Sequence, residues 1–128
     1  MRAIVDTHAF LWLLADDRRL SAPARAVLEA DANTILFSAA SAYEIAIKAR
    51  LGRLELPEPA ESYVVDRLAL AAFQPLAITL AHAARAGTLP PIHGDPWDRL
   101  LVAQAQVEGI AIVTADKAIS EYDVETIW

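Results

Sequence analysis

A chain of 128 residues is expected to form one domain over residues 1–128, since a domain of this size buries roughly two-thirds of its unfolded surface. Hydrophobic residues make up 55% of it and its net charge is −6, which argues against disorder and against nucleic-acid binding by bulk positive charge. The absence of cysteine excludes disulfides, zinc–thiolate sites and cysteine nucleophiles. No apolar run approaches the ~18 residues needed to cross a membrane and no secretory signal is visible, so a cytoplasmic protein without membrane association is expected.

Apolar segments typical of strands alternate with segments typical of helices along the chain. The alternation predicts an α/β fold with a mostly parallel sheet of four to five strands and helices on both faces. Pro75 interrupts the third strand and therefore favours an edge position for it. Strands are expected over 2–5, 34–38, 73–78, 110–114 and 124–128, and helices over 7–15, 21–30, 40–51, 60–72, 79–86, 97–108 and 116–120.

Acidic residues follow three of the predicted strands. Asp6 comes directly after the first strand, and Asp116 comes just after the fourth. Glu44 lies in the helix after the second strand, a turn or so past the point where that strand ends. Because sites in parallel α/β folds gather where the strands end, we expect these three carboxylates to lie at one edge of the sheet.

A fourth acid, Asp98, lies at the start of a later helix. It shares one helical face with Leu101, Val102 and Ala105, at spacings of three, four and seven residues. A carboxylate is seldom placed on a buried stripe without a partner. This position therefore predicts a metal ion or a cationic side chain next to Asp98.

Helix capping is the alternative explanation for the aspartates. Asp95, Pro96 and Asp98 match an N-cap, a proline at the first helical position and an acid at the third. Asp6 and Asp116 also precede helices, where the helix dipole favours a carboxylate. Taken one at a time, Asp95 and Asp98 are better explained as caps, and Asp6 and Asp116 are explained about equally well as caps or as site residues.

Convergence favours a shared site over separate caps. Glu44, with Lys48 four residues later, would by itself be a solvated ion pair. Four acids from four separated segments at one sheet edge, however, suit Mg²⁺ or Mn²⁺, which prefer carboxylate and water oxygens. Such ions activate water and stabilise the charge that develops on a phosphodiester. The candidate catalytic and metal-binding residues are Asp6, Glu44, Asp98 and Asp116.

At these residues the chain resembles PIN-domain ribonucleases, and specifically the VapC-type toxins of type II toxin–antitoxin systems. The resemblance lies in four segments that follow one another in the order of the family's motifs. The third, His93-Gly-Asp-Pro-Trp-Asp98 and onward, is the most specific, and its Trp97 replaces a frequent phenylalanine with another aromatic. The segments are Ile4–His8, Ser38–Leu54, His93–Ala105 and Thr114–Asp116.

The resemblance implies a PIN-like fold and an endoribonuclease that depends on Mg²⁺ or Mn²⁺. It also implies an RNA substrate, a cognate antitoxin protein as partner, and a homodimer. By position, Asp6, Glu44 and Asp98 would be the main metal-binding acids. Asp116 would be the fourth, often ligating through water.

Supporting roles follow from the same resemblance. The hydroxyls of Thr7 and Thr114 would orient carboxylates or waters. Asp95 matches a recurrent acid of this subgroup, although capping is its favoured role. Arg99 and Lys48 are candidates for contact with the RNA phosphates, with an exposed side chain or an ordinary ion pair as the alternative.

The histidines and aromatic residues give weaker signals. His8 and His93 lack the paired spacing of a zinc site and are predicted at the rim of the acidic pocket. His82 is predicted on a helix surface. Tyr43 and Trp97 are predicted in the core, with base stacking as the alternative.

Two other functions fit parts of the sequence. A phospho-acceptor receiver domain is also small, α/β and built around an acidic metal pocket, and Lys117 matches its late lysine. Its mid-chain strand should end in an acid, however, and here it ends in Ser38. A catalytically silent PIN scaffold that only binds a partner is the second alternative, and the four intact acids argue against it.

Overall fold

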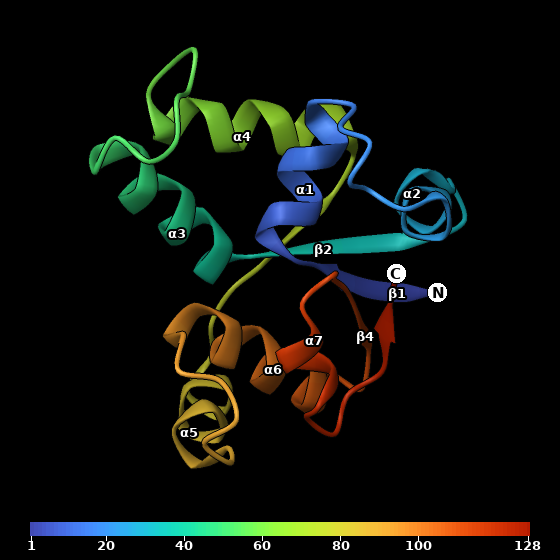
Figure 1. Cartoon of the computed structure of the whole chain (residues 1–128), viewed down its shortest axis with the longest axis vertical. Helices are drawn as coiled ribbons and strands as arrows, with labels where there is room; N and C mark the ends of the chain where they lie inside the picture. The colour runs from blue at the N-terminus through green and yellow to red at the C-terminus, as the bar shows by residue number, and fades with distance from the viewer.

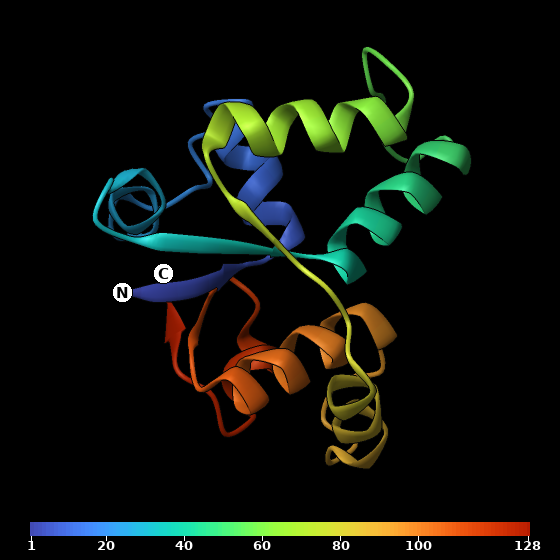
Figure 2. The ribbon, with the colours of Figure 1, turned by 180° about the vertical axis from the view of Figure 1, so that it is seen from behind.

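A computed structural model describes all residues, 1–128. Its centre is one five-stranded sheet in the order β3-β2-β1-β4-β5, with every neighbouring pair parallel (Figures 1 and 2). The predicted α/β fold with a parallel sheet is therefore confirmed. The strands are β1 (Arg2–Val5), β2 (Thr34–Ser38), β3 (Gln74–Leu76), β4 (Ala111–Val113) and β5 (Thr126–Ile127). The helices are α1 (Thr7–Leu14), α2 (Ala22–Glu29), α3 (Ala39–Arg50), α4 (Ala60–Ala71), α5 (Leu80–Thr88), α6 (Pro96–Glu108) and α7 (Lys117–Ser120).

Helices cover both faces of the sheet and give the protein two hydrophobic cores. Since successive side chains of a strand point to opposite faces, Ala3 and Val5 of β1 enter one core and Ile4 enters the other. The first core packs the sheet against α1, α2 and α4, and the second packs it against α5, α6 and α7 (Figure 1). The central strand is buried on both sides, which explains its uninterrupted apolar sequence.

The outer strands are shorter than the sequence predicted. β3 has three residues and β5 has two, because each pairs with a neighbour on one side only. β3 lies at the edge, as Pro75 indicated, since proline has no N–H to donate to a second neighbour. No helix of the structure is both long and apolar enough to cross a membrane.

The starts of several helices meet at the carboxyl edge of the sheet. Asp6 caps α1 directly after β1, Ser38 caps α3 at the end of β2, and Asp116 caps α7 just beyond β4. Asp95 caps α6, which leads into β4. Each cap side chain accepts a backbone N–H of its own helix, so the sequence fixes both the helix starts and the polar character of this edge.

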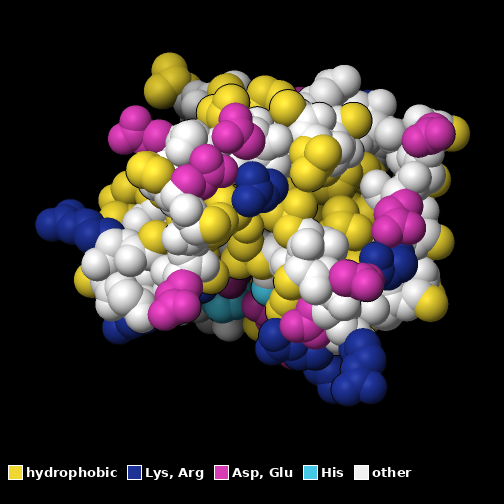
Figure 3. All heavy atoms as spheres, turned by 90° about the horizontal axis from the view of Figure 1, so that it is seen from above, with side chains coloured by type: hydrophobic (Ala, Val, Ile, Leu, Met, Phe, Trp, Pro, Cys, Tyr) yellow, Lys and Arg dark blue, Asp and Glu magenta, His cyan; other side chains and the backbone are white.

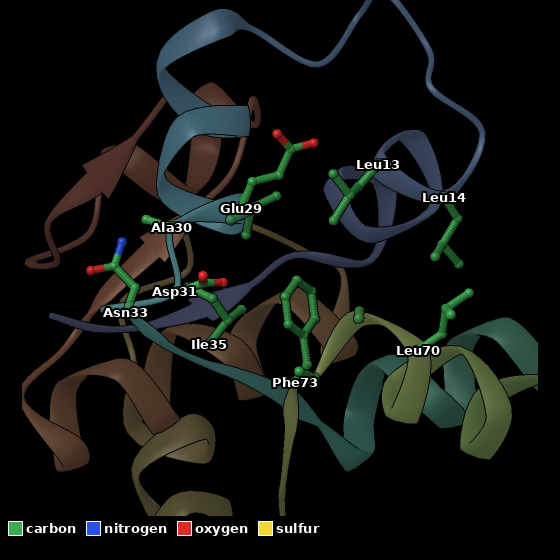
Figure 4. Close-up of a pocket in the computed structure, with 12 residues that line it drawn as sticks. Leu13, Leu14, Glu29, Ala30, Asp31, Asn33, Ile35, Leu70 and Phe73 are labelled. Atoms are coloured by element: carbon green, nitrogen blue, oxygen red, sulfur yellow. The ribbon is translucent and has the colours of Figure 1, made fainter.

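A cavity of about 490 Å³ lies near the opposite end of β2. Leu14 of α1 and Leu70 of α4 face each other at one side of it, and Leu13 lies above Phe73 and Ile35 (Figure 4). Hydrophobic side chains also line a hollow on the face of the molecule seen in Figure 3. The lining of the cavity includes none of the four predicted site acids, so the cavity is separate from the chemistry proposed for the carboxyl edge.

Two side chains lie differently from their sequence predictions. Tyr43, expected in the core, is 60% exposed and packs edge-on against Trp97, with ring centroids 6.2 Å apart. His82, expected on a helix surface, is buried and completes the N-terminal cap of α5. Its Nδ1 accepts the backbone N–H of Thr79, while the Thr79 hydroxyl accepts the backbone N–H of His82. A histidine seldom fills that third position of a capping box, which is why the pattern gave no warning.

Candidate active site

Asp6 is the most deeply buried of the four acids. Its Oδ1 accepts the backbone N–H of Thr7 at 2.6 Å, and its Oδ2 accepts the Thr114 hydroxyl at 2.6 Å. His8 lies 3.3 Å from the same Oδ2 through its Nδ1. Burial raises the pKa of Asp6, opposed by the nearby His8 and by these hydrogen bonds. The hydrogen bonds therefore hold the carboxylate rigidly, while burial makes its charged form unfavourable.

Glu44 is joined to Asp6 through one threonine. The Thr7 hydroxyl donates to Glu44 Oε1 at 2.7 Å, while the backbone N–H of the same residue donates to Asp6. Lys48 donates to Glu44 Oε2. The pair is not the solvated surface pair that the spacing alone predicted, because the Glu44 side chain is only 8% exposed. The Lys48 side chain is 41% exposed, so its cation lies between the buried Glu44 carboxylate and the solvent.

A second threonine joins Asp6 to Asp116. The Thr114 hydroxyl donates to Asp6 and accepts the backbone N–H of Asp116 at 3.0 Å. Asp116 itself accepts the backbone N–H of Ala118 at 2.8 Å and so caps α7. Capping and site formation are therefore compatible in Asp116, since Oδ1 caps the helix and Oδ2 lies 2.9 Å from His93 Nε2, among the other acids.

Asp95 and Asp98 divide the two roles that the sequence left open. Asp95 Oδ1 accepts the backbone N–H groups of Trp97 and Asp98 at 2.8 and 3.3 Å, so Asp95 is the cap of α6. The Asp98 side chain accepts no backbone N–H, and it turns toward His93. Burial, followed by the charges of Asp6 and Asp95, raises the pKa of Asp98 to about 7.

His93 lies between two of the acids. Its Nε2 is 2.9 Å from Asp116 Oδ2 and 3.0 Å from Asp98 Oδ2, and potential ligand atoms of the three residues lie within 4.8 Å of one another. Burial works against a charged His93, but the hydrogen bond to Asp116 and the charges of Asp98 and Asp116 outweigh it and raise the His93 pKa. Burial likewise works against charge on Asp116, but the hydrogen bond with His93 lowers the Asp116 pKa.

The sequence analysis assigned His93 to the rim and missed this bridge. Its only signal was position, two residues before Asp95 in the third motif. Tyr122 was missed altogether, and its hydroxyl accepts the backbone N–H of His93 at 2.8 Å. Neither contact follows a helical or strand spacing, because both depend on how the segment before α6 closes over α7.

The expectation that Arg99 contacts RNA phosphates, or forms a surface ion pair, needs correction. Its guanidinium donates to the carbonyl oxygens of Ala86, Leu89 and Pro90 at 2.9, 3.0 and 2.9 Å. It also lies 3.3 Å from the Tyr122 hydroxyl. These bonds occupy the guanidinium in holding the segment between α5 and α6.

The donor set fits a hard divalent cation. The structure links Asp6, Glu44 and Asp116 through the two threonines, and the charges of Asp6 and Glu44 both contribute to the raised pKa of Asp98. Asp98 Oδ1 accepts no hydrogen bond from the protein, so it is available as a ligand. Asp6 and Glu44 lie outside the tighter group of His93, Asp98 and Asp116. This edge of the sheet therefore gathers four carboxylates against one lysine and two histidines, and a metal ion would neutralise the remaining negative charge.

Comparison with known proteins identifies the family to which a chain with this fold and this group of acids belongs. Residues 3–125 match the family model of the PIN domain. Ribonuclease VapC22 of Mycobacterium tuberculosis is 33% identical over 120 residues, which cover 93% of this chain and 90% of that protein. The chain therefore belongs to the PIN-domain family. Ribonuclease VapC16 of the same organism is 52% identical over 60 residues, but these cover only 47% of this chain and 43% of that protein.

Solved structures share the fold. The VapBC2 structure from Rickettsia felis, bound to a DNA fragment from its promoter, superposes with a TM-score of 0.70 and covers 100% of both chains at 16% identity. The FitAcB structure from Neisseria gonorrhoeae superposes with a TM-score of 0.58 at 17% identity, covering 97% of this chain and 95% of that one. Membership in the PIN family excludes the receiver-domain alternative.

Proposed function

We propose that this protein is a metal-dependent endoribonuclease, the toxin of a toxin–antitoxin pair. The observation that carries the proposal is the meeting of acids from the ends of β1 and β4 and the starts of α3 and α6 at one edge of the sheet. The relatives named ribonucleases support the choice of RNA as substrate. The four acids are Asp6, Glu44, Asp98 and Asp116.

In this proposal, a bound Mg²⁺ or Mn²⁺ supplies Lewis-acid stabilisation of the phosphodiester and a water of lowered pKa. Asp6, Glu44 and Asp98 bind the ion, and Asp116 completes its surroundings. Thr7 and Thr114 hold the carboxylates from behind by hydrogen bonds of 2.6 to 2.7 Å, so that the oxygens need no rearrangement when the ion arrives.

Substrate contacts in this proposal come from exposed basic side chains near the acids. Lys117 follows Asp116 directly, is exposed and forms no ion pair. Lys48 binds Glu44 and is 41% exposed, and Arg50 lies exposed and unpaired at the end of the same helix. The net charge of −6 is compatible with RNA binding, because metal and these side chains would offset the acids locally.

A protein antitoxin is the proposed partner. The structural neighbour from Rickettsia felis is a VapBC complex, and this chain is similar to it in fold. A homodimer is proposed with it, supported by several large hydrophobic side chains that are exposed in the single chain, among them Leu70 at 79% and Leu80 at 91%.

Cleavage of a labelled RNA by the purified protein tests the activity. We expect cleavage with Mg²⁺ or Mn²⁺, loss of cleavage with a chelator, and loss of at least about 100-fold in Asp6→Asn and Asp98→Asn, since each variant removes a metal ligand charge. Asp66→Asn is the matched control, because Asp66 is exposed on α4, away from the site acids. Full cleavage in both site variants contradicts the proposal. A folded wild type that cleaves nothing with either metal supports the silent scaffold instead.

A further inference from the structure

The two nitrogens of His93 have different partners. Nδ1 accepts the backbone N–H of Asp95 at 3.1 Å. A ring nitrogen that accepts a hydrogen bond must carry a lone pair, so the proton of the neutral ring resides on Nε2. The main chain of the third motif thereby selects one tautomer of this histidine.

The selected tautomer turns an N–H group toward the acids. Nε2 is hydrogen-bonded to Asp116 Oδ2 at 2.9 Å and also lies 3.0 Å from Asp98 Oδ2, so this side of the ring faces both carboxylates. A metal ligand needs a lone pair on that nitrogen, and here the lone pair is on the other side of the ring. His93 therefore faces the acids as a donor, although its distances alone would also suit a ligand.

The segment that carries His93 is held from behind. Its backbone N–H donates to the Tyr122 hydroxyl at 2.8 Å, and that hydroxyl donates to the Pro90 carbonyl at 3.1 Å. Arg99 donates to the same Pro90 carbonyl at 2.9 Å. A ring flip that offered the lone pair of either nitrogen to a metal would break the bond from Asp95, and the anchored main chain cannot follow such a movement.

We propose that His93 is a positioning residue, which holds Asp116 in place beside Asp98 through its Nε2–H and does not coordinate the metal. The proposal rests on the proposed function, since the ion is the one assigned there. Two carboxylates this close repel each other, and a donor that is hydrogen-bonded to Asp116 and lies 3.0 Å from Asp98 offsets that repulsion. Other oxygens would then be left to hold the metal, among them Asp98 Oδ1, which accepts no hydrogen bond from the protein.

Two substitutions separate the two sides of the ring. In His93→Asn, the amide oxygen takes the place of Nδ1 and keeps the bond from Asp95, but nothing reaches the acids. In His93→Gln, the longer side chain brings an amide N–H near the place of Nε2. We expect Mn²⁺ affinity, measured by calorimetry, to fall about 10- to 100-fold in His93→Asn and to be largely restored in His93→Gln. Equal affinity in wild type and His93→Asn overturns the positioning role.

Two spectroscopic measurements test the donor assignment directly. In the metal-free protein at pH 9, long-range ¹H–¹⁵N spectra should show His93 protonated at Nε2, and protonation at Nδ1 overturns the proposal. In the Mn²⁺-loaded protein, pulsed EPR should show no directly coordinated ring nitrogen, and a coupling that disappears in His93→Asn identifies a ligand instead. The tautomer is measured without metal or RNA, so its result does not depend on nuclease activity. A failure of this proposal can therefore be distinguished from a failure of the proposed function.

Discussion

The hydroxyl of Thr114 joins Asp6 to Asp116, although Asp6 and Thr114 are 108 positions apart in the chain. It donates to the Asp6 carboxylate at 2.6 Å and accepts the backbone N–H of Asp116 at 3.0 Å. Both bonds are made at the ends of adjacent strands, β1 and β4, where the parallel register brings Val5 opposite Val113. The spacing of two site acids therefore depends on the sheet and on a single side chain.

Thr114→Val should damage both stability and activity. The change keeps the shape but leaves a buried carboxylate without one donor and a backbone N–H without its acceptor, which costs about 1–3 kcal/mol of unfolding free energy. We expect RNA cleavage to fall by about 10- to 100-fold, as for other groups that orient metal-binding carboxylates. Urea denaturation and single-turnover cleavage measure the two effects.

Thr114→Ser and Thr88→Val are the controls for this substitution. Serine keeps the hydroxyl and should recover most of the activity. Thr88 is exposed at the end of α5, where its hydroxyl bonds only to the Arg85 carbonyl, so its replacement should change neither quantity by much. A Thr114→Val protein with unchanged cleavage shows that the orientation of Asp6 does not depend on this hydroxyl.

Arg99→Lys should act through structure and not through RNA contact. The guanidinium donates to three carbonyl oxygens, one in the last turn of α5 and two in the segment that follows it, and a lysine ammonium cannot match that fork. We expect a loss of about 1–3 kcal/mol in the free energy of unfolding, measured by urea denaturation, and a lower kcat because His93 is less well held. Arg85→Lys, an exposed change on α5, is the control. If stability is unchanged and the KM for RNA rises, then Arg99 contacts the RNA phosphates, as the sequence analysis first expected.

Asp98 should make the metal-free protein less stable as the pH rises. Burial and the charge of Asp6 raise its pKa from 3.8 to about 7 in the folded state. Between these values the folded protein binds more protons than the unfolded chain, so the free energy of unfolding falls as the pH increases through this window. Asp98→Asn has no such titration, and its Tm in EDTA should therefore exceed that of the wild type more at pH 8 than at pH 4.5.

The comparison of wild type and variant isolates Asp98 from the other titrating groups. Asp66→Asn, exposed on α4, should follow the wild-type pH dependence of Tm. If the Tm difference between wild type and Asp98→Asn is the same at both pH values, then the carboxyl group does not titrate abnormally in the folded protein.

The sequence predicted the parts of this site that depend on regular structure. Asp6 and Asp116 follow strands, and in a parallel sheet this places both at one edge wherever the chain runs between them. The motif resemblance added the two threonines, and in the structure each of their hydroxyls donates a hydrogen bond to a carboxylate oxygen. The α/β class and the edge position of the third strand followed from alternation and from one proline.

The sequence could not predict contacts that depend on irregular segments. His93 meets Asp116 across 23 residues and Tyr122 across 29, in a stretch without helical or strand periodicity. Arg99 was misjudged for the same reason, because its acceptors are main-chain carbonyls that no residue type reveals. Polar side chains that bind main-chain groups, or that meet across irregular segments, leave no periodic pattern in the sequence.

Divalent cations should stabilise the wild-type protein. Carboxylates that repel one another in the folded pocket are far apart in the unfolded chain, so a cation that bridges them binds the folded state preferentially. At a concentration 100 times its Kd, an ion contributes about 2.7 kcal/mol, which raises Tm by several degrees in a domain of this size. Thermal denaturation with MgCl₂, MnCl₂ or EDTA measures the shift. NaCl at matched ionic strength is the control for screening, and Asp98→Asn is the control for site binding. A Tm shift that NaCl reproduces, or that Asp98→Asn retains in full, shows that the cations act on the surface at large and not on this cluster of acids.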